Sequence, residues 1–198
     1  MGGGVPRQRH RAAVSDTLGT HHRMTTTTAS SDYIRDLEIT VDETAAWLIN
    51  IPDPVARWRP KPNAWSPIEI IGHLIDSAAN NHTRFVRAPG QADLIFPGYA
   101  QDDWVRLQNY VAAPWHEVVT LWHSYNRHIA RVMAAIPAPV RYRKHDRHNL
   151  DELAWQPYAA DKPATLDDLM RDYVLHLEHH LTQVRDRVRD ARTTGTPA

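Results

Sequence analysis

The 198-residue sequence has no cysteine, no long apolar run and no net charge. Without cysteine it can form no disulfide framework, no cysteine-based metal site and no thiolate nucleophile, so any reacting thiol must come with a substrate. No stretch approaches the roughly 18 apolar residues of a membrane-spanning helix, which excludes a transmembrane protein. The 23 basic residues balance 23 acidic ones, and a neutral chain lacks the positive field on which nonspecific nucleic-acid binding depends.

Residues 1–30 also have almost none of the large apolar side chains that a folded segment needs. Four arginines stand against a single acidic residue there, and a run of threonines follows. Such a composition is typical of disordered tails. We expect a disordered tail at 1–30, one folded domain at 31–193 and a short tail at 194–198. Either translation starts at Met24 or the first tail is incidental to function.

Four long segments of the domain repeat apolar side chains at steps of three and four, the pattern of amphipathic helices. They span residues 32–51, 67–88, 115–136 and 165–192, and one short helix is expected at 102–110. The pattern of alternating apolar residues that is typical of a strand is absent.

The second long helix has the clearest start signal. Ser66 is a favourable N-cap, Pro67 takes the first helical position, and Glu69 completes a capping box. The fourth helix is expected to start at Thr165, with acidic residues in its first turn.

Two long connections separate the helices, at residues 89–113 and 137–164. Connections of the second length are uncommon unless they are functional or cross the bundle. This one is basic, with Arg141, Arg143, Lys144 and Arg147. Four long helices with two long connections predict an all-α protein, a four-helix bundle.

The last helix carries three histidines. On a helical wheel of about 100° per residue, His176 and His180 flank the apolar stripe one turn apart, whereas Glu178 and His179 point to solvent. Two histidines with this spacing can share a metal ion. Because Glu178 faces away, it cannot act as the base of an H-E-x-x-H metalloprotease motif. The alternative is a half-exposed helix that happens to be rich in histidine.

The second helix carries His73 on its polar side, opposite the apolar stripe. The other members of this polar column are Glu69, Asp76, Ser77, Asn80 and Arg84. The column is either an ordinary solvated face or the border of a groove in which His73 meets His176 and His180. Three neutral imidazoles plus a water form an open, reactive divalent site.

The two histidine-bearing helices resemble those of the DinB/YfiT-like superfamily. The resemblance rests on Trp65-Ser66-Pro67 followed by Gly72-His73-Leu74-Ile75-Asp76 and Ser77-Ala78-Ala79-Asn80-Asn81-His82, and on Asp172-Tyr173-Val174 followed by His176-Leu177-Glu178-His179-His180 and Gln183. It covers about residues 32–190. The basic connection at 137–164 departs from the family pattern, which leaves the substrate more open than the metal.

The resemblance implies a cytoplasmic four-helix bundle, often a homodimer, that binds a divalent metal ion such as nickel or zinc. The ligands at matching positions here are His73, His176 and His180. Characterised members include S-transferases that use mycothiol or bacillithiol and a thiol-dependent isomerase, and many others are described as metal-dependent hydrolases. The implied function is activation of a thiol or water for S-transfer or hydrolysis on a small-molecule substrate, with a low-molecular-weight thiol as co-substrate in the first case.

Three polar residues lie close to these ligands along their helices. Asp76, Asn80 and Gln183 are candidates to orient the imidazole N–H groups or the substrate. The alternative for each is a simple surface position.

For several further residues the sequence predicts a role less specifically. Tyr99 and Trp104 are candidates for pocket walls, although aromatics in a helical protein more often belong to the core. Arg84 is interpreted as solvated, with contact to an anionic substrate as the alternative. The other histidines of the domain are interpreted as surface or hydrogen-bonded residues: His82, His116, His123, His128, His145 and His148.

Two rival hypotheses remain. The bundle can be a non-catalytic binding protein for dimerisation or sensing, with a structural metal or none bound specifically. It can also be an interaction bundle without metal, if His73 points to bulk solvent. An open coordination position distinguishes a catalytic from a structural metal site.

Overall fold

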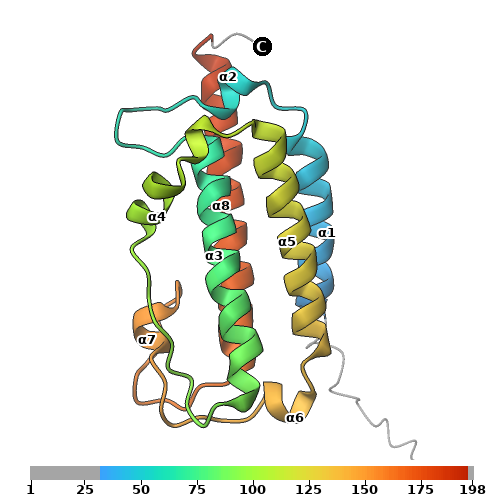
Figure 1. The fold of residues 1–198 in the computed structure, drawn as a ribbon, viewed down its shortest axis with the longest axis vertical. Helices are drawn as coiled ribbons and strands as arrows, with labels where there is room; N and C mark the ends of the chain where they lie inside the picture. Colours follow the sequence, from blue (N-terminus) through green and yellow to red (C-terminus); the bar gives the residue numbers. More distant parts are fainter. Residues whose placement is uncertain (1–31, 196–198) are drawn as a thin grey trace, which may run out of the picture.

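The computed structural model describes residues 32–195, and within them the secondary structure is helical apart from two isolated β-bridges. Four long helices form a bundle (Figure 1), which confirms the predicted all-α fold. They are α1 (Asp32–Leu48), α3 (Pro67–Arg87), α5 (Trp115–Ala135) and α8 (Leu166–Thr193). The connections hold α2 (Asp53–Ala56), η1 (Ala88–Gly90), α4 (Gln101–Gln108), η2 (Tyr110–Ala112), α6 (Ala138–Arg141) and α7 (Leu150–Leu153).

The predicted tail 1–30 lies outside the described residues, and so do residues 196–198 of the predicted tail 194–198. Within the described part of the chain, no helix combines the length and the apolar character that crossing a membrane requires.

The long helices do not alternate in direction. Helices α3 and α5 run one way and α1 and α8 the other (Figure 1). Both α1 and α3 pack against α5 and α8, which places α1 and α3 on a diagonal of the bundle. Because the neighbours α3 and α5 are parallel, the chain between them must return along the bundle, and it carries α4 back onto α3. This returning segment covers the polar side of α3.

The core combines the apolar stripes of the four helices. The largest fully buried side chains include Trp122 of α5, Tyr173 of α8 and Phe85 of α3. Each such side chain contributes roughly 1.5–3 kcal/mol relative to an exposed one. The hydroxyl of Tyr173 donates a hydrogen bond to Asn126 Oδ1 and so ties α8 to α5 inside the core.

The predicted starts of α3 and α8 agree with the structure, whereas the predicted end of α1 does not. The backbone N–H and the hydroxyl of Ser66 both donate to Glu69 Oε2, at 2.9 and 2.6 Å, so α3 begins at the predicted capping box. Helix α8 begins after Thr165, as predicted. Helix α1 ends at Leu48 rather than at the predicted Ile51. A residue that precedes proline disfavours helical backbone, and Pro52 instead caps α2.

The basic connection at 137–164 is partly a structural anchor. Arg141 is buried, and its Nε donates to Asp167 Oδ1 at 2.6 Å, while Tyr33 donates to the same oxygen at 2.7 Å. The connection also pairs with the segment after α3, since Leu94 N–H donates to Arg147 O at 3.0 Å. Arg143, Lys144 and Arg147 are exposed.

Candidate metal centre

Three histidine rings from two helices meet inside the bundle. His73 lies in the second turn of α3, and His176 and His180 lie one turn apart in α8, which packs against α3. Nε2 of His73 is 3.2 Å from Nε2 of His176. One nitrogen from each of the three rings lies within 4.8 Å of the other two. Among the described residues this is the one convergent group of three or more histidines or carboxylates.

Burial keeps these imidazoles neutral. His73 is 0% exposed and His180 9% exposed, while His176 is half-buried. Burial lowers the pKa of His73 to about 3, with a smaller contribution from the charge of His180. Burial and then repulsion by the neighbouring imidazoles lower the pKa of His176 to about 3, and burial likewise lowers the pKa of His180. At neutral pH the rings therefore present lone pairs rather than positive charges.

Neighbouring side chains fix the ring orientations of the two α8 histidines. Nδ1 of His180 is 2.9 Å from Gln183 Oε1, an acceptor that requires the proton on Nδ1 and leaves the Nε2 lone pair free. Nδ1 of His176 is 3.4 Å from Ser77 Oγ. Nδ1 of His73 is buried without a hydrogen-bond partner within residues 32–195.

This donor set fits a divalent transition metal. Two nitrogens at 2.0–2.1 Å from one tetrahedral ion lie about 3.3 Å apart, close to the 3.2 Å between His73 and His176. Without an ion, the 3.2 Å contact between the two Nε2 atoms is a hydrogen bond in which one of them carries the proton, and a bound cation would take the lone pairs of both atoms instead. No carboxylate belongs to the group, so a bound ion would keep its full double charge.

Asp76 lies one turn after His73 on α3, but its carboxylate accepts hydrogen bonds from the segment that returns over this helix. It is 1% exposed, and its Oδ1 accepts hydrogen bonds from the hydroxyl of Tyr110 at 2.7 Å and from the amide of Gln108. Burial raises the pKa of Asp76 to about 6, although both hydrogen bonds act in the opposite direction. Gly72 makes this arrangement possible, because a Cβ there would lie 2.1 Å from Tyr110 Cδ2.

Of the other two residues predicted to orient the ligands, Gln183 contacts a histidine and Asn80 does not. Gln183 contacts His180 directly, as described above. The structure does not bring Asn80 to the imidazoles; its amide donates to the carbonyl of Asp76 on its own helix at 2.9 Å. Glu178 is exposed, as predicted, but His179 is half-buried, which corrects its predicted solvent position. The ring of Trp155 packs 4.8 Å from that of His179 and covers it.

Aromatic rings surround His73. The ring of Trp65 lies 5.0 Å from it, and that of Tyr99 lies 6.5 Å from it in a stacked arrangement. Trp104 packs on Tyr99 at 5.0 Å and is 37% exposed, so it supports the wall from outside.

The polar column of α3 is not a solvated face. Glu69, Asp76, Ser77 and Arg84 are buried together with His73. In particular, Arg84 is 6% exposed, so its interpretation as a solvated residue is wrong. The returning segment with α4 and η2 packs over this side of α3 and shields it.

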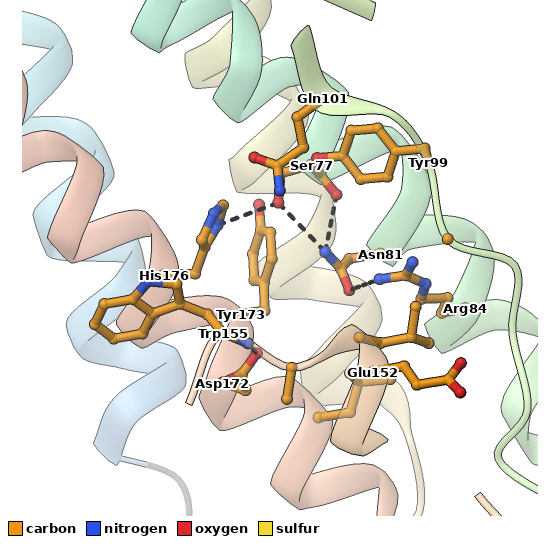
Figure 2. Close-up of a pocket in the computed structure, with 14 residues that line it drawn as sticks. Ser77, Asn81, Arg84, Tyr99, Gln101, Glu152, Trp155, Asp172, Tyr173 and His176 are labelled. Atoms are coloured by element: carbon orange, nitrogen blue, oxygen red, sulfur yellow. Dashed lines mark hydrogen bonds between the residues drawn. The ribbon is translucent and has the colours of Figure 1, made fainter. Parts of the chain in front are cut away.

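A cavity of about 210 Å³ opens beside His176 (Figure 2). Its walls come from α3, from α8, from the segment 98–101 and from residues 152–155. Hydrogen-bonded side chains of α3 line one wall of the cavity, from the histidines outward (Figure 2). Asn81 Nδ2 donates to Ser77 Oγ at 3.3 Å, and Arg84 donates to Asn81 Oδ1 at 3.2 Å. The three-histidine group therefore borders a space large enough for a small molecule.

Several residues that line this cavity have no function that the sequence pattern predicts. The pattern puts Ser77 in the polar column without a function, and it predicts none for Asn81, Trp155 or Asp172. Ser77 and Asn81 follow His73 at steps of four, and this spacing on one helix face was the available signal. Nothing in the sequence indicated that residues 152–155 return to the cavity.

Comparison with known proteins places this geometry in a family. A family model described as the DinB superfamily matches residues 36–184, a span that contains all three histidines. The chain belongs to the DinB superfamily. The match confirms the resemblance that was based on the α3 and α8 motifs.

The fold of this DinB chain is also similar to a solved structure, that of YfiT from Bacillus subtilis. YfiT is described as a probable metal-dependent hydrolase with an unusual four-helix bundle topology. The TM-score is 0.67 at 16% sequence identity, and the match covers 96% of this chain and 95% of the other. At that identity the likeness shows a shared fold. No curated protein matches the chain.

Proposed function

We propose that this DinB protein is a metal-dependent enzyme for a small-molecule substrate. His73, His176 and His180 would hold one divalent ion, and the substrate would occupy the adjoining cavity. The observation that carries the proposal is the convergence of three neutral imidazoles at the wall of a cavity, through His176. Three protein ligands leave a coordination position open for chemistry, whereas a structural site would fill it with a fourth.

Nickel or zinc is the proposed ion. Neutral imidazole nitrogens suit both metals, and the group contains no carboxylate that would favour magnesium or calcium. When bound, such an ion supplies a Lewis acid that makes a water or a thiol nucleophilic near neutral pH.

The residues of the chain would orient the ligands and the substrate. Gln183 holds the proton of His180 on Nδ1, and Ser77 Oγ can accept a hydrogen bond from His176 Nδ1 when Nε2 is a ligand. Tyr99 lines the cavity, and burial raises its pKa to about 12. Its hydroxyl thus stays protonated at neutral pH and can donate a hydrogen bond to a substrate oxygen.

The proposed reactions are S-transfer from a low-molecular-weight thiol and hydrolysis. Because the chain has no cysteine, a sulfur nucleophile must enter the cavity with a co-substrate. The homodimer and the cytoplasmic location stay predictions.

Turnover with defined metal loading tests the proposal. Wild type loaded with nickel or zinc is assayed with small thiols plus electrophilic acceptors, and separately with simple esters and amides. His116→Ala serves as the matched control, since that histidine lies on α5 with 69% of its side chain exposed. Metal-dependent turnover in wild type and in the control, lost in His176→Ala, is expected. Turnover that survives in His176→Ala would contradict the proposal, and metal binding without any turnover would favour the non-catalytic binding bundle.

A further inference from the structure

A buried arginine forms the end of the cavity that is remote from the histidines. Arg84 is 6% exposed, yet none of the ion pairs among the described residues involves it. Its guanidinium donates to Asn81 Oδ1 at 3.2 Å and to the carbonyl of Pro97 at 3.0 Å. Both acceptors are neutral. Burial of a charge without an ion-pair partner is costly. A guanidinium has five N–H groups, and the described residues accept hydrogen bonds from only two of its nitrogens.

No carboxylate among the described residues forms an ion pair or hydrogen bond with Arg84, although the charge of Asp172 acts on it across the cavity and favours the protonated guanidinium. Asp172 also lines the cavity, but its two oxygens accept the backbone N–H groups of Gln156 and Trp155, at 2.8 and 2.9 Å. Glu152 lines the cavity as an exposed residue, where solvent screens its charge. Arg84 is thus the one buried charged side chain among the cavity-lining residues.

Arg84 and the histidines lie at opposite ends of one space. Ser77, which contacts His176, and Arg84 are seven residues apart on α3, or roughly 10 Å along the helix. The guanidinium reaches back by about one turn to contact Asn81, which brings it roughly 5 Å closer to the histidines. A ligand that touches both ends therefore needs a chain of several atoms between its two functional groups.

We propose that the substrate or thiol co-substrate of this protein carries a carboxylate, which binds Arg84 while the reacting group lies beside His176. The inference rests on the proposed function for the role of His176 and on Arg84 alone for the carboxylate. A guanidinium fork matches a carboxylate with two parallel hydrogen bonds, and the pair is stronger than one between neutral groups. The anion would supply the hydrogen-bonded carboxylate partner that Arg84 does not have within residues 32–195.

Binding of two probes that differ only in charge tests this assignment. Hexanoate and hexanol have the required length, and their dissociation constants are measured by NMR titration of the full-length protein. The titrations use wild type, Arg84→Gln, Arg84→Lys and Arg87→Gln. Arg87 is the matched control, because it is an exposed arginine one turn further along α3 that does not line this cavity. Each titration is run with nickel-loaded and with metal-free protein.

Wild type and Arg87→Gln should bind hexanoate more tightly than hexanol, and Arg84→Gln should weaken hexanoate binding by about tenfold to a hundredfold. Arg84→Lys should keep part of the preference, since it retains the charge but not the fork. Thermal unfolding shows whether Arg84→Gln folds. If Arg84→Gln does not fold, the test rests on whether wild type prefers hexanoate to hexanol and whether Arg84→Lys reduces that preference.

Equal binding of the two probes to wild type, or a hexanoate preference that survives in Arg84→Gln, would overturn the inference. A preference that requires nickel and ignores Arg84 would mean that the carboxylate binds the ion, which overturns the inference while supporting the metal site. A preference that depends on Arg84 in protein that binds no metal would support the inference and contradict the proposed function.

Discussion

Replacing Gly72 by alanine should disrupt the packing behind the three histidines. The added Cβ would lie 2.1 Å from Cδ2 and 2.4 Å from Cγ of Tyr110, far inside van der Waals contact. The clash is with a ring that is 7% exposed and held by its hydrogen bond to Asp76, so it cannot turn away freely.

The expected cost follows from three contributions. Overpacking of a buried site costs about 1–3 kcal/mol. Displacement of Tyr110 also weakens its hydrogen bond to the Asp76 carboxylate, a type of bond that contributes roughly 1.5–3 kcal/mol. Alanine favours a helix over glycine by about 1 kcal/mol, which offsets part of this loss. The net decrease in the free energy of unfolding should be about 1.5–5 kcal/mol.

Chemical denaturation measures this free energy, and Gly90→Ala is the matched control. A Cβ at Gly90 would meet no atom within 4 Å, so that substitution should change stability by less than about 1 kcal/mol. In a double-mutant cycle, Tyr110→Ala should remove most of the cost of Gly72→Ala, because the clashing ring is gone. The reasoning is refuted if Gly72→Ala is as mild as Gly90→Ala, or if its cost is unchanged in the Tyr110→Ala background.

Three further predictions concern protons, ligand orientation and the buried anchor. The folded pKa values of His73 and His176 near 3 lie below the unfolded value of about 6.5, so the unfolded state binds more protons, and the stability of metal-free protein should fall as pH decreases from about 6.5 toward 3. Denaturation across this range should show a shallower slope in His176→Ala, and an equal slope would contradict the assignment. Gln183→Leu removes the acceptor at His180 Nδ1 and should weaken metal affinity about 10–100-fold in a chelator competition, whereas Gln183→Glu should bind nearly as wild type; equal affinities for all three proteins would exclude the orienting role. Arg141→Met leaves Asp167 buried with Arg171 as its remaining ion-pair partner and should cost about 3 kcal/mol in urea denaturation, and a loss below about 1 kcal/mol would show that the pair is not an anchor.

The sequence was sufficient for the parts of the fold that rest on local patterns. The apolar periodicity placed the four long helices, and the capping box at Ser66 and the start signal at Thr165, with its acidic first turn, placed two of their starts. The i, i+4 spacing put His176 and His180 on one side of α8, and the resemblance of the flanking motifs paired them with His73.

The surroundings of the site depended on tertiary packing that no local pattern encodes. A helical wheel separates a polar from an apolar face, but it does not show that a segment without periodicity will cover the polar face. Residues 91–112 do this for α3, so Arg84 and Asp76 are buried rather than solvated. Arg141 likewise belongs to a basic run in which no local pattern indicates a partner, and the carboxylate that it contacts, Asp167, lies 26 positions away.

Elemental analysis of tag-free protein tests most directly whether the three histidines form one metal site. Wild type and His176→Ala are compared at equal concentration after dialysis and after reconstitution with nickel or zinc. We predict about one equivalent of a single divalent metal in wild type and in His116→Ala, and a loss of that metal in His176→Ala. Wild type that cannot be loaded, or a His176→Ala variant that retains its metal, would contradict the site.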